Sequence, residues 1–158
     1  MSQGPGSEGR RESPLERADR NWDELLGELR VTQTGVAILF SVLLVVPFSA
    51  RFEDVDVFTR GVYVTALLLS ATTTVTLIGP VAFHRLLFAQ GRKPHLVRFG
   101  NRMAVGGLAL LCLTLGTVLL LVTDVVLARS TAFALSAVFT VGTALLWWLP
   151  ARLARRDT

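Results

Sequence analysis

The sequence has little of the chemistry on which most enzymes and metalloproteins depend. Its 158 residues include one cysteine, Cys112, and two histidines, His84 and His95. A single cysteine excludes a disulfide within the chain, and no cysteine, histidine or carboxylate cluster has metal-site spacing. No nucleophile–base pair and no phosphate-binding glycine loop stand out. We therefore predict that the protein is not an enzyme and that it uses no cofactor or metal.

Charged residues are almost absent from four long stretches of the chain, in which apolar residues gather. Hydrophobic residues make up 51% of the sequence, and about 20 of them in a helix cross the hydrocarbon core of a bilayer. The stretches are 31–50, 57–83, 103–124 and 131–149. They predict an all-α polytopic membrane protein, with four transmembrane helices in two antiparallel hairpins that form one domain over 31–150.

The residues before the first apolar stretch divide into a tail and a helix. Residues 1–12 are polar and rich in glycine, so we predict a disordered tail. Ser13, Pro14 and Glu16 have the pattern of a capping box with proline at the first helical position. Apolar residues then recur at helical spacing, which predicts an amphipathic interfacial helix over 13–30.

The cations are distributed unevenly along the chain. Thirteen of the sixteen lie before residue 31, in the connection 83–102 or in the basic C-terminal tail 151–158. Cationic segments stay on the cytoplasmic side, so both termini and this connection are expected in the cytoplasm, with the four helices in a bacterial plasma membrane. Because the cations lie beside membrane spans, we do not expect nucleic acid as a partner. The candidates for contact with anionic lipid, or with the acidic face of 13–30, are Arg92, Lys93, His95, Arg98 and Arg102.

Asp124 is the acidic residue of greatest interest, because it falls at the outer end of a predicted span. A carboxylate at a helix C-terminus opposes the helix dipole and needs a cation. Arg51, Arg60 and Arg129 are predicted on the same side. We favour a structural ion pair over the alternative, a proton-binding carboxylate.

Gln33, His84 and Arg85 are the other candidate functional residues. Gln33 could bond a neighbouring helix or face headgroup water, and His84 could be packed at the interface or relay protons. Asp56 follows two other acids, Glu53 and Asp54. We interpret it as the N-cap of the next helix, because the ligand spacing of a calcium loop is missing.

Small residues recur on one face of each of the last two predicted spans. Such stripes let helix backbones approach closely, and the short connection around Arg129 makes these spans antiparallel neighbours. We expect the two stripes to meet. Their members are Gly106, Ala109, Cys112 and Gly116 on the first, and Ala132, Ser136, Thr140 and Ala144 on the second.

Several sequence runs together resemble a known family. They are the run from Ala18 to Gly35 that contains NWDELLGELRVTQTG, Arg51-Phe52 followed by Asp56, the pair His84-Arg85, and Trp147-Trp148 before Pro150. The chain after residue 12 resembles uncharacterised short four-helix membrane proteins of actinobacteria, of the Streptomyces type. The resemblance implies an integral membrane protein of a family with no established activity.

Two functions fit these features. The first is a non-enzymatic protein that acts through helix packing, as a homo-oligomer or as an accessory subunit of another membrane protein. The alternative is a small ion-, proton- or solute-coupled transporter of the antiporter kind that works as an oligomer. The alternative would use Asp124, His84 or the threonines between residues 72 and 76.

Overall fold

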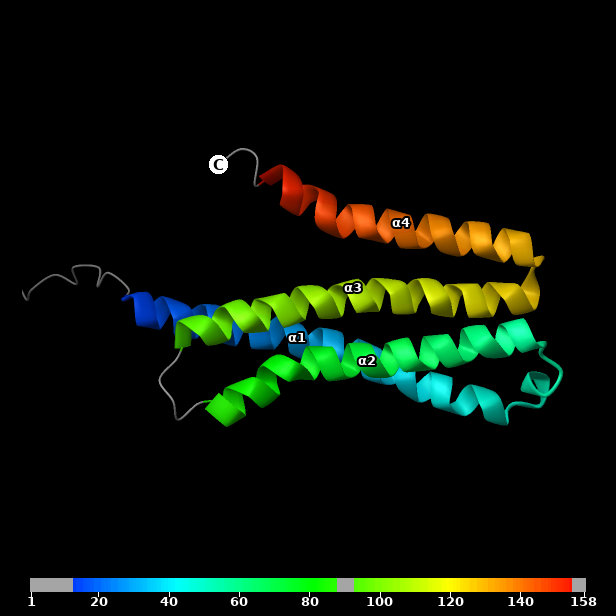
Figure 1. Ribbon diagram of the computed structural model, residues 1–158, viewed down its shortest axis with the longest axis horizontal. Helices are drawn as coiled ribbons and strands as arrows, with labels where there is room; N and C mark the ends of the chain where they lie inside the picture. Colours follow the sequence, from blue (N-terminus) through cyan, green and yellow to red (C-terminus); the bar gives the residue numbers. More distant parts are fainter. Residues whose placement is uncertain (1–12, 88–92, 155–158) are drawn as a thin grey trace, which may run out of the picture.

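A computed structural model describes residues 13–87 and 93–154, and it contains four long helices. Two short 3-10 turns, η1 (Val46–Phe48) and η2 (Ala50–Phe52), connect the first helix to the second. The described residues include no strand. The helices are α1 (Pro14–Val45), α2 (Val57–Leu87), α3 (Lys93–Val126) and α4 (Arg129–Ala154) (Figure 1).

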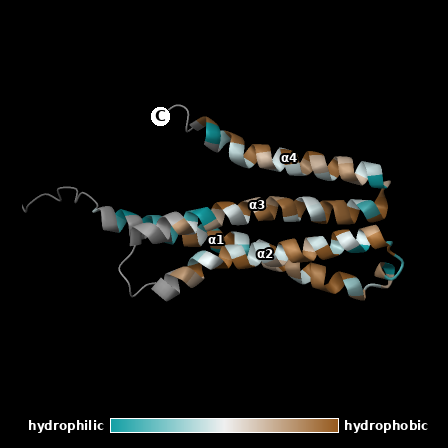
Figure 2. Cartoon of the chain, in the orientation of Figure 1, coloured by the Kyte–Doolittle hydropathy of each residue, from teal (hydrophilic) through white to brown (hydrophobic). Residues whose placement is uncertain are grey.

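Four helical segments are long and apolar enough to cross a membrane. These segments are Asp23–Phe48, Val57–Phe83, Phe99–Val126 and Arg129–Pro150. Figure 2 shows apolar residues along most of each helix. The predicted all-α fold with four helices suited to spanning a membrane is therefore confirmed for the described residues.

The first helix differs from its prediction at both ends of the expected span. Ser13 caps it, because its hydroxyl accepts from the Glu16 amide at 3.2 Å while the Glu16 carboxylate accepts from the Ser13 amide at 2.8 Å. The expected helix over 13–30 and the expected span over 31–50 are one continuous helix, α1. It ends at Val45, since Pro47 has no N–H with which to continue an α-helix, and η1 follows.

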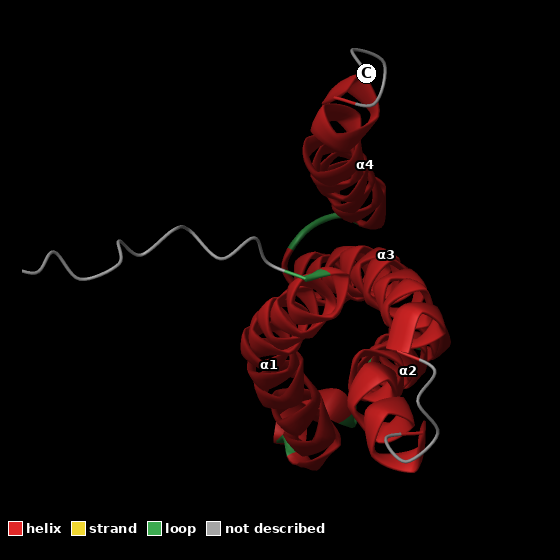
Figure 3. Cartoon of the chain, turned by 90° about the vertical axis from the view of Figure 1, so that its left-hand side faces the viewer, coloured by secondary structure: helices red, strands yellow, loops and turns green. Residues whose placement is uncertain are grey.

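The most extensive helix interface joins α2 to α3, and α1 packs against both of them. Seen end-on, these three helices lie around a common axis (Figure 3). One buried cluster, around Tyr63 and Leu121, lies at the end of the bundle where α2 begins, which we call the Asp56 end. A second cluster, around Leu77 and Ala104, lies towards the opposite end.

The buried face of α2 follows a heptad pattern. Of its described residues, seven buried ones alternate at spacings of four and three, and buried Val62 lies beside them: Thr59, Tyr63, Ala66, Ser70, Thr73, Leu77 and Pro80. This spacing keeps one seam of a helix towards its neighbour. Thr73 meets Thr114 of α3 across the seam, with 3.1 Å between their hydroxyl oxygens. The helix contains Pro80, and it turns away from α3 towards its C-terminal end (Figure 1).

The fourth helix is placed differently from the other three. It contacts α3 but neither α1 nor α2 along its backbone. The two helices start close together after the connection 127–128 and then diverge (Figures 1 and 3). Ala132 and Ser136 are buried, and no other residue of α4 whose burial is described is. The bundle is thus three packed helices with a fourth attached at the Asp56 end.

Candidate functional site

Four residues from three helices form a polar cluster at the Asp56 end: Asp56, Thr59, Asp124 and Arg129. Asp56 immediately precedes α2, and its Oδ1 accepts from the backbone N–H of Thr59 at 2.8 Å. This bond satisfies one of the free amides at the helix start. The predicted N-cap role of Asp56 is confirmed.

The hydroxyl of Thr59 lies between two carboxylates. Its oxygen is 2.8 Å from Oδ1 of Asp56 and 2.6 Å from Oδ2 of Asp124. A threonine hydroxyl has one proton, so it donates to one of these carboxylates at a time. The polar cluster therefore brings two acids together around a single shared hydroxyl donor.

Arg129, at the first position of α4, supplies charge to both acids. Its Nε donates to Oδ1 of Asp124 at 3.1 Å, and its Nη2 donates to Oδ2 of Asp56. The guanidinium carbon also lies 4.1 Å from the ring centre of Phe58, a cation–π contact that helps to hold it. Of the three cations expected on this side, Arg129 is thus the partner of Asp124.

The two carboxylates differ in exposure. The Asp124 side chain is 2% exposed, whereas that of Asp56 is 53% exposed. The hydrogen bond from Arg129, followed by those from the amide and hydroxyl of Thr59, holds the pKa of Asp56 well below its usual range. Burying an ionised carboxylate is costly without a partner. Arg129 therefore gives the buried Asp124 carboxylate a counter-ion, and its contacts tie α2, α3 and α4 together.

Gln33, another candidate functional residue, links α1 to α2 by a hydrogen bond. Its Nε2 donates to the carbonyl oxygen of Leu77 at 2.7 Å. Of the two roles left open for Gln33, the structure therefore has the bond to a neighbouring helix. Pro80 cannot donate to the carbonyl of residue 76, and Gln33 supplies a donor to the next carbonyl along α2.

The remaining polar candidates lie far from the polar cluster. His84 and Arg85 are in the last turn of α2, about 37 Å from Thr59 by helical rise. Lys93, His95 and Arg98 are in the first turns of α3, Arg102 follows as an exposed residue, and Arg92 lies outside the described residues. The structure therefore does not bring His84 to Asp124.

The small-residue stripes meet over part of their length. The Ser136 hydroxyl donates to the Gly116 carbonyl at 2.6 Å, and Cys112 Sγ lies 3.5 Å from the Thr140 carbonyl. A Cβ added to Gly116 would lie 2.0 Å from the Thr140 hydroxyl. The prediction is wrong for Gly106, whose added Cβ would meet nothing within 4 Å, and for exposed Ala109. They miss the second stripe because α4 has diverged.

Two other glycines make close approaches that the sequence analysis missed. A Cβ on Gly107 would lie 2.4 Å from a methyl carbon of Leu77, and one on Gly79 would lie 2.1 Å from Met103. Gly100, Gly107, Thr114 and Leu121 are buried at intervals of seven residues. A search for heptads in α3 would have found this seam.

No group of three metal-binding side chains is formed by the histidines, cysteines and acids of the described ranges. The chain belongs to a family of unknown function, DUF6328, whose model matches residues 11–151. No curated protein and no solved structure matches the chain. A proposal about function therefore rests on the polar cluster and on the small-residue stripes of α3 and α4.

Proposed function

We propose that this protein is a non-enzymatic membrane protein that acts by packing its helices against a second copy of itself or against another membrane protein. The observation that carries the proposal is the divergence of α4 from α3 (Figure 1). It leaves small residues of α3 without a close neighbour. Gly106 would accept a Cβ with nothing within 4 Å, and Ala109 is exposed.

Small residues have a specific use in a membrane. Lipid tails are as apolar as leucine, so helices associate there through close backbone approach and not through hydrophobic burial. A glycine that faces lipid gains nothing from its small size. A partner helix lying along Gly106 and Ala109 would use that small size. The bundle as described leaves that place open, because α4 contacts neither α1 nor α2 along its backbone.

Disulfide cross-linking in native membranes tests this proposal. The change Ala109→Cys, in a Cys112→Ala background, should give a covalent dimer or a cross-link to a partner. Val75→Cys is the matched control, because Val75 is 71% exposed on α2 and lies outside the stripes. Adding Gly106→Leu should abolish the cross-link without unfolding the monomer, since its side chain meets no neighbour within the chain. A strict monomer, or equal cross-linking through Val75, would contradict the proposal.

We also propose that both termini and the connection between α2 and α3 face the cytoplasm of a bacterial cell. The support is the cation distribution, with three arginines at or beside the other two connections and thirteen cations elsewhere, because cationic segments stay on the cytoplasmic side. Reporter fusions after Arg92 and after Thr158 should be active on the cytoplasmic side. Activity on the opposite side would reverse the orientation.

Ion- or proton-coupled transport is a second candidate, and one observation favours it. Asp124 is a nearly fully buried carboxylate that shares the hydroxyl of Thr59 with Asp56, and acids in membrane segments often serve transport. Proton or sodium flux into proteoliposomes tests this candidate. Flux that is absent, or unchanged by Asp124→Asn, would remove Asp124 from consideration.

A further inference from the structure

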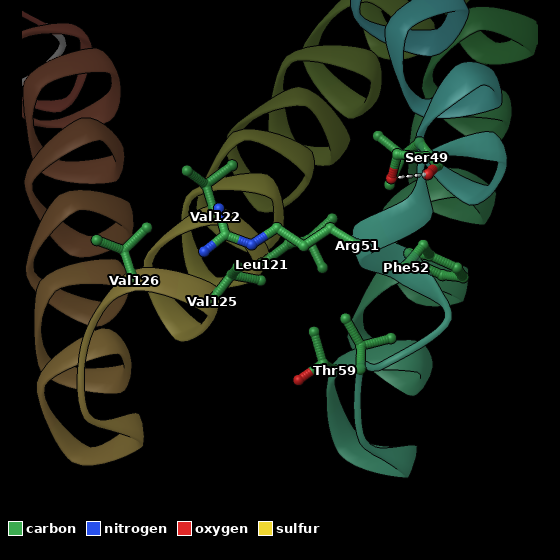
Figure 4. A pocket seen from close by; sticks show the side chains of 10 residues that line it. Ser49, Arg51, Phe52, Thr59, Leu121, Val122, Val125 and Val126 are labelled. Carbon is green, nitrogen blue, oxygen red and sulfur yellow. Dashed lines mark hydrogen bonds between the residues drawn. The ribbon is translucent and has the colours of Figure 1, made fainter.

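A cavity of about 250 Å³ opens at the Asp56 end, between the connection 46–56 and the last two turns of α3. Thr59 lies at its edge (Figure 4). Most of its walls are aliphatic or aromatic: Val46, Phe52 and Val55 on one side, and Val122, Val125 and Val126 on the other. It is a small apolar recess at the end of the membrane spans.

A single cation lies across this recess. Figure 4 shows the Arg51 side chain reaching from η2 towards α3, with its guanidinium beside Val122. Arg51 follows the end of one candidate span by three residues, and Val122 is one turn from the end of another. The guanidinium therefore lies at the depth where the hydrocarbon of a bilayer gives way to its headgroups.

Arg51 differs from Arg129 in having no partner among the residues that the structure describes. Arg129 pairs with both Asp56 and Asp124, whereas Arg51 makes no ion pair or side-chain hydrogen bond to any residue of 13–87 or 93–154. Two acids, Glu53 and Asp54, follow it in the same connection, and it pairs with neither. A guanidinium beside apolar walls matches a ligand that has both an anionic group and an apolar group.

We infer that this recess binds a membrane phospholipid, whose phosphate pairs with Arg51 and whose acyl chain fills the cavity. The planar fork of an arginine matches the oxygens of a phosphate and forms charge-assisted hydrogen bonds with them. Phospholipid phosphates lie at the depth of the guanidinium, with their chains directed into the hydrocarbon. A single ligand thus satisfies the cation and covers the apolar walls.

The surrounding charges indicate how the lipid is selected. Three cations and four acids lie at this end, so the region has no excess of positive charge: Arg51, Arg60 and Arg129 against Glu53, Asp54, Asp56 and Asp124. Recognition then depends on the fork of Arg51 and not on a general attraction to anionic headgroups. We expect phosphatidylglycerol and phosphatidylethanolamine to bind alike. This inference does not depend on the proposed self-association, because the recess is formed within one chain.

Native mass spectrometry of the full chain in detergent tests the inference. The probes are dioleoyl phosphatidylglycerol, dioleoyl phosphatidylethanolamine and dioleoylglycerol, which has the same chains without phosphate. Arg51→Gln should weaken the 1:1 adduct with both phospholipids about tenfold, the worth of one charge-assisted pair. It should leave dioleoylglycerol binding unchanged. Arg60→Gln is the matched control, because Arg60 is an exposed cation that does not line the recess.

A second variant tests the apolar half of the site. Val125→Trp should fill the cavity and weaken all three lipids, while labelling of buried Cys112 by a thiol dye reports whether the variant is folded. Equal phospholipid binding by Arg51→Gln and Arg60→Gln would overturn the inference. Binding of glycerol phosphate as tight as that of the phospholipids would also overturn it, because the chains would then play no part.

Discussion

The side-chain amide of Gln33 donates to the carbonyl oxygen of Leu77 across 2.7 Å, three residues before the proline of α2. Leu77 is fully buried, and it also presses against Gly107 of α3. One residue of α2 is therefore held from two sides, by a hydrogen bond from α1 and by a close backbone approach from α3. The three packed helices therefore contact one another at Leu77, next to Pro80.

Removing the side-chain amide of Gln33 should destabilise the contact between α1 and α2. Gln33→Leu keeps a similar volume but loses the bond to Leu77, and hydrogen bonds between membrane helices contribute about 0.6 to 2 kcal/mol. We expect the free energy of unfolding in detergent to fall by about 1 kcal/mol. The rate at which a thiol dye labels buried Cys112 measures it. Thr34→Val is the control, since the Thr34 hydroxyl bonds within its own helix to Arg30.

Two adjacent glycines of α3 should respond differently to alanine. The new Cβ of Gly107→Ala would lie 2.4 Å from a methyl carbon of Leu77, which is fully buried and has no room to yield. We expect a loss of about 1 to 3 kcal/mol in the free energy of unfolding. Gly106→Ala meets nothing within 4 Å and should be neutral or slightly stabilising. Equal thermal midpoints for the two variants would show that α2 and α3 pack differently.

Loss of Arg129 should destabilise the bundle more than loss of either neighbouring cation. Arg129→Gln leaves Asp124, whose side chain is 2% exposed, without its counter-ion, and a buried carboxylate without a partner destabilises the folded state. The double variant Asp124→Asn/Arg129→Gln should recover much of this loss, because no buried charge remains. Arg60→Gln is the control and should change stability by less than about 0.5 kcal/mol. A double-mutant cycle on unfolding midpoints measures the coupling.

Asp56 predicts how stability depends on acidic pH. Its pKa is lowered in the folded protein, chiefly by Arg129 and then by Thr59, so the unfolded chain binds the proton more tightly. The stabilisation is fully present above the unfolded value, about 3.9, and is lost as the pH falls through the lower folded value. The thermal midpoint of the wild type should therefore decrease when the pH is lowered below about 4.

The variant Asp56→Asn isolates that contribution. Its midpoint should be lower than that of the wild type at pH 7, and the difference between the two should shrink on acidification. Asp54→Asn removes the same charge from an exposed residue of the same connection. Its curve should run parallel to the wild-type curve. A constant difference between Asp56→Asn and the wild type across this range would exclude Asp56 as the source.

The candidate residues show where prediction from sequence stops. Asp56 was assigned correctly because an N-cap depends on residues within one turn. For Asp124 the sequence offered three cations on the same side, and only Arg129, which begins α4 directly after the connection 127–128, lies within reach. The small-residue stripes were predicted as a whole, but they meet only where α3 and α4 are close.

The four apolar stretches and the Ser13 and Asp56 caps can be predicted from the sequence, because each depends on residues close together in the chain. The structure was needed to show that α1 is one helix from Pro14, that α4 lies apart from α1 and α2, and which glycines face a neighbour. These features escape prediction because lipid and protein are equally apolar in a membrane. Hydropathy therefore shows that a helix spans the bilayer, but not which of its faces another helix covers.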